Sequence, residues 1–231
     1  MVRNWLRAVV FLLSLGAGFV RAQSTTSSAA TEPAEPPPGV VRVACIGDSI
    51  TYGAGIANRE QNSYPAKLGG LLGDGFAVRN FGVNGTTALK VSDRPYVERP
   101  IYAKALAYKA DVLVMAFGTN DTKPQNWKGA DAFTADYKAI LADFRKANPA
   151  VKVFVCLPVQ CFLDGEWSIR DHVIRDEVIP AVKKIAAEEK ATVIDLRSAL
   201  NGKHDLFPDN IHPNAEGAAI MAKTVAAAVK S

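Results

Sequence analysis

The chain has 231 residues, of which 48% are hydrophobic and 22% are charged. This composition is too apolar for a disordered protein, and the length favours one domain over two large ones. The formal net charge of +4 comes from 27 basic and 23 acidic residues, which are scattered along the chain and form no basic run. A basic surplus without a basic patch is weak support for a polyanion, so we expect no nucleic-acid partner.

The first 22 residues have the pattern of an export signal. Arg3 and Arg7 precede an apolar run over residues 8–20, which ends in small or branched residues of the kind that a signal peptidase accepts. The run is ~13 residues long, shorter than the roughly 20 that span a bilayer as a helix. We expect a signal peptide over 1–22, with an uncleaved anchor as the alternative. The mature protein is then periplasmic or secreted and has no membrane span.

Residues 23–39 contain three consecutive prolines and no large apolar side chain, which predicts an extended linker. The expected domain follows over residues 40–231. Export to an oxidising compartment permits a disulfide bond. Cys45 and Cys156 lie in apolar runs, where buried free thiols are the simpler expectation, and a bridge between Cys156 and Cys161 stays open.

Short runs rich in β-branched residues predict the strands of the domain. Four are clear, over 41–46, 111–117, 151–157 and 192–196, and a weaker one covers 76–81. None alternates cleanly between apolar and polar residues, as is typical of strands covered on both faces. Apolar stripes with helical spacing run from Phe133 to Phe144 and from Val173 to Ile185, and a last helix is expected over 213–229. Strands that alternate with helices predict a three-layer α/β domain with a parallel sheet.

In an open parallel sheet, ligand sites lie beyond the carboxyl ends of the strands. Four blocks occupy such positions or follow the last strand: 47–51 (GDSIT), 82–85 (GVNG), 118–121 (GTND) and 209–212 (DNIH). These blocks carry a serine, glycines, an asparagine and an Asp-x-x-His pair in that order. We therefore expect the chemistry of the protein at this edge of the sheet.

Serine becomes a strong nucleophile when a base takes its proton and a carboxylate holds that base in one tautomer. His212 suits the role of base because Asp209 lies three residues before it, on what is expected to be one turn at the start of the last helix. We expect Ser49 as nucleophile, His212 as general base and Asp209 as the orienting acid. His172 and His204 lie in charged or polar stretches, where solvated surface positions are expected.

An oxyanion that forms when a serine attacks an ester needs hydrogen-bond donors aimed at it. Three candidates converge in the predicted fold: the Ser49 N–H, the Gly82 N–H and the Asn120 side-chain amide. A glycine at position 82 permits a close approach of the backbone to a ligand. Asp48, beside the nucleophile, is expected to fix the turn by accepting backbone N–H groups and not to act as the acid of the triad.

The blocks GDSIT, NFGVNGTT, GTND and DNIH together resemble the SGNH hydrolases, also called the GDSL esterase and lipase family. This resemblance implies a flavodoxin-like fold with a central five-stranded parallel sheet of order 2-1-3-4-5. It also implies a serine esterase with the triad Ser49, His212 and Asp209, and an oxyanion hole completed by Gly82 and Asn120. The chain departs from many relatives at Asn84, where a small residue is common and where the shape of the acyl pocket would change.

The resemblance leaves the substrate open, because relatives act on lipids, thioesters, aryl esters and acetylated sugars. Export, the lack of a long apolar lid and aromatic residues near the strand ends favour an acetyl group on a sugar. The segment GTNDTKPQNW also resembles that of carbohydrate-acting members, including sialate O-acetylesterase-like and acetylxylan esterase-like proteins. The candidate substrate contacts are Tyr52, Asn84, Trp127, Phe162 and Trp167.

Several alternatives stay open. The first is a lipid or broad acyl esterase of the lysophospholipase or arylesterase type, and the second is a non-catalytic glycan-binding module on an esterase scaffold. Arg94 and Arg170 are candidates to meet an acidic sugar, although surface salt bridges are the simpler expectation. No cofactor is expected, and no metal, since no pair of His or Cys residues has ligand spacing. The oligomeric state is not fixed by these patterns.

Overall fold

The fold is described from a computed structural model, in which residues 35–231 are defined. The expected signal peptide over 1–22 and residues 23–34 of the expected linker lie outside the described residues. The sheet and its helices belong to one unit that begins at Pro36.

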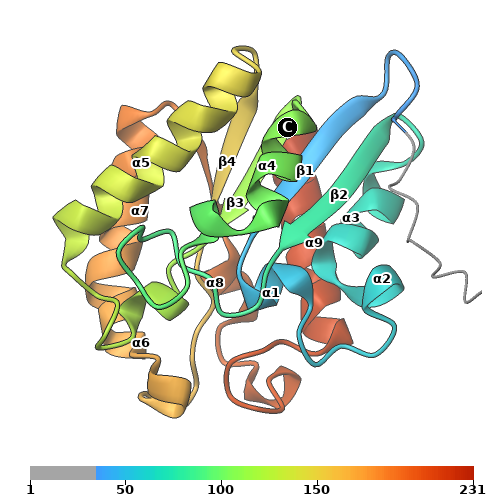
Figure 1. Ribbon diagram of the computed structural model, residues 1–231. Coiled ribbons are helices and arrows are strands. Elements are labelled where there is room, and N and C mark those ends of the chain that lie inside the picture. The colour runs from blue at the N-terminus through green and yellow to red at the C-terminus, as the bar shows by residue number, and fades with distance from the viewer. Residues whose placement is uncertain (1–34) are drawn as a thin grey trace, which may run out of the picture. The chain divides into compact units, whose positions relative to one another are not determined.

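Five strands form one sheet in which each neighbouring pair runs parallel (Figure 1). The strands are β1 (Val41–Gly47), β2 (Phe76–Gly82), β3 (Val112–Ala116), β4 (Lys152–Leu157) and β5 (Thr192–Asp195). Their order across the sheet is β2-β1-β3-β4-β5. The predicted α/β class, the five strands and the strand order are therefore confirmed.

Helices follow the strands in chain order. The α-helices are α1 (Ser49–Tyr52), α2 (Arg59–Asn62), α3 (Tyr64–Leu72), α4 (Pro100–Ala107), α5 (Ala130–Ala147), α6 (Asp171–Val173), α7 (Ile179–Glu188), α8 (Leu196–Leu200) and α9 (Ala215–Lys230). Single turns of 3-10 helix are η1 (Tyr96–Glu98), η2 (Asn120–Thr122), η3 (Glu166–Ser168) and η5 (His204–Leu206), and a π-helical turn, η4 (Ile174–Val178), joins α6 to α7.

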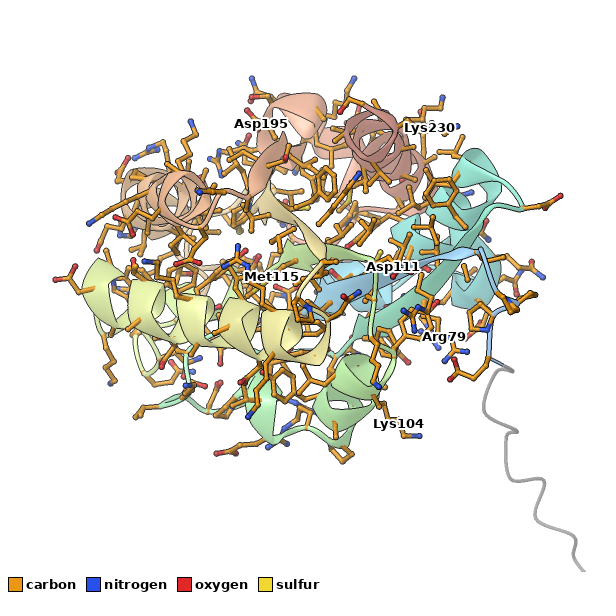
Figure 2. All side chains as sticks on the ribbon, turned by 90° about the horizontal axis from the view of Figure 1, so that it is seen from above. Arg79, Lys104, Asp111, Met115, Asp195 and Lys230 are labelled. Atoms are coloured by element: carbon orange, nitrogen blue, oxygen red, sulfur yellow. The ribbon has the colours of Figure 1, made fainter. Side chains whose placement is uncertain are left out.

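Alternate residues of the strands face two separate apolar layers, because successive side chains of a strand point to opposite faces. Ile46 and Met115 pack in the layer with α4, α5 and α7, whereas Cys45 and Val114 pack in the layer with α3, α8 and α9. Figure 2 shows the sheet between the two layers, with Lys104 of α4 on one side and Lys230 of α9 on the other. The strands are thus covered on both faces, which explains the continuous apolar runs in the sequence.

The expected apolar stripes lie on buried helix faces. All five stripe residues of α5 are buried, from Phe133 to Phe144, and the second stripe is buried along α6, η4 and α7. The last helix begins at Ala215, two residues later than expected, because the Asn214 side chain caps it by accepting the N–H groups of Glu216 and Gly217 (3.0 Å each). The DNIH block therefore lies in the turn before α9 and not on the helix.

The three cysteines are all buried with free thiols. Cys45 lies in β1, Cys156 in β4, and Cys161 in the loop that follows β4, where its Sγ donates to the Leu163 carbonyl (3.1 Å). The open alternative of a bridge between Cys156 and Cys161 is therefore not formed. Among residues 35–231, no helix has the length and apolar character needed to cross a membrane.

Candidate active site

Strand β1 passes directly into α1, with Asp48 as the capping residue between them. The Asp48 Oδ1 accepts the Ile50 N–H (2.9 Å), which confirms the expected role of this carboxylate in fixing the turn. Ser49 is the first residue of the helix and is only 8% exposed. Burial raises the pKa of Asp48 to about 6, against the lowering effects of the Ile50 N–H and the nearby His212.

The structure brings Ser49, His212 and Asp209 together although 163 residues separate the serine from the histidine. The distance from His212 Nε2 to Ser49 Oγ is 2.8 Å, and that from His212 Nδ1 to Asp209 Oδ2 is 2.6 Å. An N–H at Nδ1 that donates to the carboxylate leaves Nε2 to accept the serine proton. The three side chains therefore have the hydrogen-bonded order that a nucleophile, a base and an orienting acid require.

The turn itself holds the Asp209 carboxylate in place. Its Oδ1 accepts the N–H groups of Ile211 (3.1 Å) and His212 (2.7 Å), while Oδ2 faces the His212 ring. Burial raises the pKa of Asp209, but the bonds from the His212 N–H, the His212 ring and the Ile211 N–H outweigh it, so the pKa lies below its ordinary value. The hydrogen bonds of the turn thus favour the ionised form of the Asp209 carboxyl group.

Asn210 lies between Asp209 and His212 in the sequence and is held by three hydrogen bonds. It has a positive φ of 66°, which is unusual for a residue other than glycine. Its N–H donates to the Phe207 carbonyl (3.0 Å), its carbonyl accepts the Phe162 N–H (2.9 Å), and its Oδ1 lies 2.7 Å from His204 Nε2. The Phe162 ring stacks on the His204 ring with centroids 4.9 Å apart. His204, expected to be a solvated histidine, is exposed but also supports the catalytic turn.

The structure does not leave the Gly82 N–H available as an oxyanion donor. This N–H donates to Asn80 Oδ1 (2.9 Å), and the Asn80 amide donates in turn to the carbonyls of Thr51 (2.9 Å) and Tyr52 (3.3 Å). A Cβ at position 82 would lie 2.3 Å from the Tyr52 backbone nitrogen. The expectation that Gly82 supplies a donor is therefore wrong: the glycine is needed because β2 packs against the backbone of α1.

The second glycine of the same block is placed differently. Among residues 35–231, the Gly85 N–H has no hydrogen-bond partner, and neither has the Ser49 N–H. Thr86, the next residue, accepts the Asn120 side-chain amide at its carbonyl (3.2 Å) and approaches the Gly47 carbonyl with its hydroxyl (3.4 Å). The hydrogen bond from the Gly82 N–H to Asn80 thus distinguishes the two glycines, one needed for packing and one with a free N–H.

Asp121, the last residue of the GTND block, is fully buried and joins two loops of the site. Its Oδ1 accepts the Leu89 N–H (2.9 Å) and its Oδ2 accepts the Gly118 N–H (3.1 Å). Burial raises the pKa of Asp121 to about 7. The hydrogen bond from the Leu89 N–H lowers this pKa, and the nearby Asp48 carboxylate raises it further. No local sequence pattern indicates this role of Asp121, which organises the loop after β3.

Two of the five expected substrate contacts, Trp127 and Phe162, pack against neighbouring side chains. Trp127 is half-buried, packs on Phe133 at 5.7 Å between centroids and donates its Nε1–H to Glu177 (3.0 Å). Phe162 is half-buried against His204, as described above. Both aromatic residues thus have packing roles, which no local pattern in the sequence indicates.

The other three candidates remain accessible. Tyr52 is half-buried at the end of α1, with the Arg59 guanidinium 4.0 Å from its ring centre, while Asn84 and Trp167 are exposed. Arg170 forms no salt bridge in the described part of the chain but donates to Thr122, as detailed below, and Arg94 is exposed. No group of three or more His, Cys, Asp or Glu side chains among residues 35–231 is arranged to hold a metal ion.

The close approach at Gly82 predicts the effect of adding one methyl group. We expect Gly82→Ala to lower the free energy of unfolding by about 1–3 kcal/mol, because the new Cβ forces β2 and α1 apart. Urea denaturation followed by circular dichroism measures the change. Gly70→Ala in α3 is the matched control, since no atom lies within 4 Å of its Cβ position, and we expect it to leave stability unchanged or raise it slightly. Equal effects of the two variants would contradict the assignment.

The buried carboxyl groups of Asp48 and Asp121 predict a pH dependence of stability. In the unfolded chain both carboxyl groups have the ordinary pKa of 3.8. In the folded protein the pKa is about 6 for Asp48 and about 7 for Asp121. Between these values the unfolded state binds fewer protons, so the free energy of unfolding falls as the pH rises, by up to about 1.4 kcal/mol per pH unit for each group. Urea titrations at about pH 5 and about pH 8 test this sign.

Asp121→Asn cannot release a proton, so we expect a smaller loss of stability between the two pH values than in the unchanged protein. Asp74→Asn, which alters an exposed carboxylate, serves as the control and should keep the full slope. A slope that is the same in all three proteins would show that Asp121 is ionised throughout this range.

Known proteins with similar sequences identify the family of the chain. Residues 45–220 match the GDSL-like lipase/acylhydrolase family. Over 213 residues, the chain is 40% identical to an acetylxylan esterase of Xylanibacter ruminicola. The match covers 84% of this chain and 44% of that relative, so the chain spans less than half the length of the acetylxylan esterase.

Solved structures share the fold at lower identity. Est24, a carbohydrate acetylesterase from Sinorhizobium meliloti, is 19% identical with a TM-score of 0.67 over 82% of this chain and 98% of that chain. An aryl esterase of M. smegmatis is 19% identical with a TM-score of 0.69 over 83% and 99% of the two chains. The resemblance seen in the four sequence blocks is confirmed: the chain belongs to the GDSL-like lipase/acylhydrolase family.

Proposed function

We propose that the protein is a serine esterase that removes acetyl groups from carbohydrates. The observation that carries the proposal is the continuous set of hydrogen bonds from Ser49 Oγ to His212 Nε2 (2.8 Å) and from His212 Nδ1 to Asp209 Oδ2 (2.6 Å). Similarity to an acetylxylan esterase supports an acetylated polysaccharide as the substrate class. Export through the signal expected over residues 1–22 is part of the proposal, because such polymers are met outside the cytoplasm.

In the first half of the reaction, His212 Nε2 takes the proton of the Ser49 hydroxyl while Oγ attacks the acetyl carbonyl carbon. Asp209 keeps the ring in the tautomer with its N–H at Nδ1 and stabilises the imidazolium that forms. When the tetrahedral intermediate collapses, the bond from the acetyl carbon to the sugar oxygen breaks. His212 returns its proton to that oxygen, which leaves a sugar hydroxyl and an acetyl group on Ser49.

In the second half, a water molecule replaces the sugar. His212 takes a proton from the water as its oxygen attacks the acetyl group on Ser49, and a second tetrahedral intermediate forms. This intermediate expels the Ser49 oxygen, which recovers its proton from His212. Acetate leaves, and the side chains return to the arrangement that the hydrogen bonds hold in the free protein.

The developing oxyanion needs donors that are not already used by the protein. We assign this role to the N–H groups of Ser49 and Gly85 and to the second N–H of the Asn120 amide, whose first N–H binds the Thr86 carbonyl. Support comes from the free N–H groups at positions 49 and 85 among the described residues. The bond from the Asn120 amide to the Thr86 carbonyl (3.2 Å) also fixes the block that carries Gly85 next to the asparagine.

The test is acetate release from acetylated xylan and hydrolysis of p-nitrophenyl esters of increasing acyl length. We expect turnover that is highest for acetyl and falls as the acyl chain grows. Ser49→Ala should lower kcat by more than about a thousandfold, since the nucleophile is lost. Asn120→Ala should lower kcat by about 100- to 1000-fold with a small change in KM, because a donor to the transition state is lost.

Three results would overturn the proposal. Rates that rise with acyl length, with turnover of lysophospholipid, would indicate a lipid or broad acyl esterase. Failure on acetylated xylan with retained activity on p-nitrophenyl acetate would reject the substrate class but keep the esterase. Activity that is unaffected by Ser49→Ala would reject the catalytic assignment itself.

The contacts of His204 predict a positioning effect on the same reaction. Because its ring holds Asn210 in the catalytic turn, we expect His204→Ala to lower kcat on p-nitrophenyl acetate by about tenfold with little change in KM. His204→Gln, which keeps a donor for the Asn210 side chain, should recover part of kcat. Lys203→Ala, at the exposed neighbouring residue, is the control and should leave the kinetics unchanged. A change in KM alone would assign His204 to substrate binding.

A further inference from the structure

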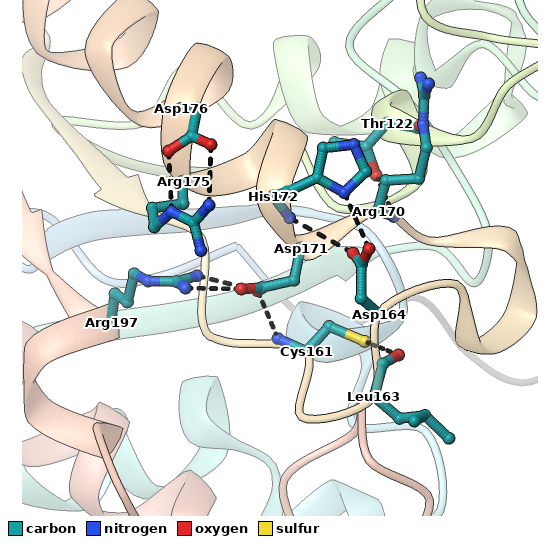
Figure 3. Close-up of polar contacts among 10 residues, drawn as sticks. All are labelled: Thr122, Cys161, Leu163, Asp164, Arg170, Asp171, His172, Arg175, Asp176 and Arg197. Atoms are coloured by element: carbon teal, nitrogen blue, oxygen red, sulfur yellow. Dashed lines mark hydrogen bonds and ion pairs between the residues drawn. The ribbon is translucent and has the colours of Figure 1, made fainter.

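Residues 162–170, here called the rim loop, join two of the catalytic blocks. At one end, the Phe162 N–H donates to the Asn210 carbonyl (2.9 Å), next to the acid and base of the triad. At the other end, the Arg170 N–H donates to Thr122 Oγ1 (3.1 Å) and its Nε donates to the Thr122 carbonyl (2.5 Å), two residues beyond Asn120. The rim loop therefore borders the candidate active site and is bound to it at both ends, and Figure 3 shows the Arg170 end beside Thr122.

The base of the rim loop is held by a buried ion pair. Asp171, 8% exposed, binds Arg197 through both carboxylate oxygens (3.0 and 2.8 Å), and its Oδ1 also accepts the Cys161 N–H (2.8 Å). Within the loop, Asp164 Oδ2 lies 2.8 Å from His172 Nδ1. Figure 3 shows these contacts between α6, α8 and the segment that follows β4. The loop is thus a preformed structure and not a free flap.

This fixed loop presents two large apolar side chains to solvent. Trp167 is 66% exposed and Leu163 is 52% exposed, whereas most apolar side chains of this size are buried in the described part of the chain. Figure 3 shows the Leu163 side chain directed away from the anchoring contacts. Trp167 and Ser168 both have positive φ values, 53° and 63°. Backbone strain of this kind persists where the surrounding contacts impose it, and it is concentrated at functional sites.

We propose that Leu163 and Trp167 form a platform that binds the sugar chain of the polymeric substrate beside the sugar whose ester is cleaved. This inference rests on the proposed function and extends it from the acetyl group to the polymer. The platform has a fixed position relative to Ser49, because the rim loop is bound to the turn that carries His212 and to the block that carries Asn120.

The chemistry of the platform suits a sugar chain better than an acyl chain. A sugar ring has an apolar C–H face and polar edges, and an open aromatic ring with polar neighbours matches both. Around Trp167 the loop carries the charged groups of Asp164 and Glu166, and its backbone turns are exposed. An acyl chain gains most from full removal from water, which an exposed ring on a charged loop does not supply.

The experiment compares Trp167→Ala with the unchanged protein on acetylated xylan and on p-nitrophenyl acetate. We expect the ratio of kcat/KM on the polymer to kcat/KM on the small ester to fall by about three- to tenfold, the range that one aromatic contact supplies. The loss should lie in KM for the polymer and not in kcat, because the platform binds ground state and transition state alike. Trp167→Phe should recover most of the ratio.

Binding without turnover separates this inference from the proposed function. In the Ser49→Ala background, we measure affinity for deacetylated xylan oligosaccharides by calorimetry, and we expect Trp167→Ala to weaken it by the same factor. Leu71→Ala is the control, because Leu71 is 39% exposed in the last turn of α3, shortly before the amino end of β2, whereas the site lies beyond the carboxyl ends of the strands.

The outcomes distinguish the proposed platform from the proposed esterase activity. Acetate release from xylan that depends on Ser49 but shows the same polymer ratio in Trp167→Ala would overturn the platform and keep the esterase. A fall of equal size on both substrates would assign the rim loop a structural role. An altered acyl-length profile in Trp167→Ala would show that the exposed pair binds acyl chains instead. Absence of xylan binding and turnover in every protein would overturn both proposals.

Discussion

The parallel pairing of all five strands is the constraint on which the site depends. Parallel strands place all of their carboxyl ends at one edge, so the blocks that follow β1, β2 and β3 meet there. The register puts Gly47 opposite Gly82 on one side and opposite Ala116 on the other. A Cβ on Gly47 would lie 2.5 Å from the Ala116 carbonyl and 2.2 Å from Thr51 Oγ1. Ser49 thus follows a strand end that is packed so closely that position 47 has no room for a side chain.

The triad completes this arrangement from a distant part of the chain. The DNIH turn comes after all five strands and is fixed by its own hydrogen bonds, by the Asn214 cap of α9 and by the contacts around Asn210. Holding Asn210 at a positive φ costs conformational energy, and the three bonds to it offset that cost. The catalytic geometry is therefore a property of the whole edge of the sheet and not of any one block.

Local patterns predicted the strands, the helix faces and the contact between Asp209 and His212, because each is encoded by neighbours in sequence. The strand runs are continuous and apolar, and Asp209 and His212 are three residues apart. The roles that depend on tertiary contacts were not predictable in the same way. Gly82 and Gly85 look equivalent in the block, and only the Asn80 side chain, which binds the N–H of the former, separates them.

Aromatic residues show the same limit. Trp127 and Trp167 are both tryptophans in loops at the same edge of the sheet, yet one donates to Glu177 and packs on Phe133 while the other stays 66% exposed. Burial of a loop residue depends on which helix passes beside it, and here α5 and η4 cover the first and nothing described covers the second. Composition alone does not distinguish a packing residue from an accessible one.

The distribution of the three thiols has a consequence for the motions of the protein. Burial raises the pKa of Cys156 to about 12 and that of Cys161 to about 11, so neither thiol reacts readily while it is buried. Cys45 and Cys156 lie in central strands, and their reaction with an alkylating reagent requires opening of the sheet. Cys161 lies at the base of the rim loop, and its reaction requires only that this loop detach. The chain thus carries its own reporters of two separate opening events, one local and one global.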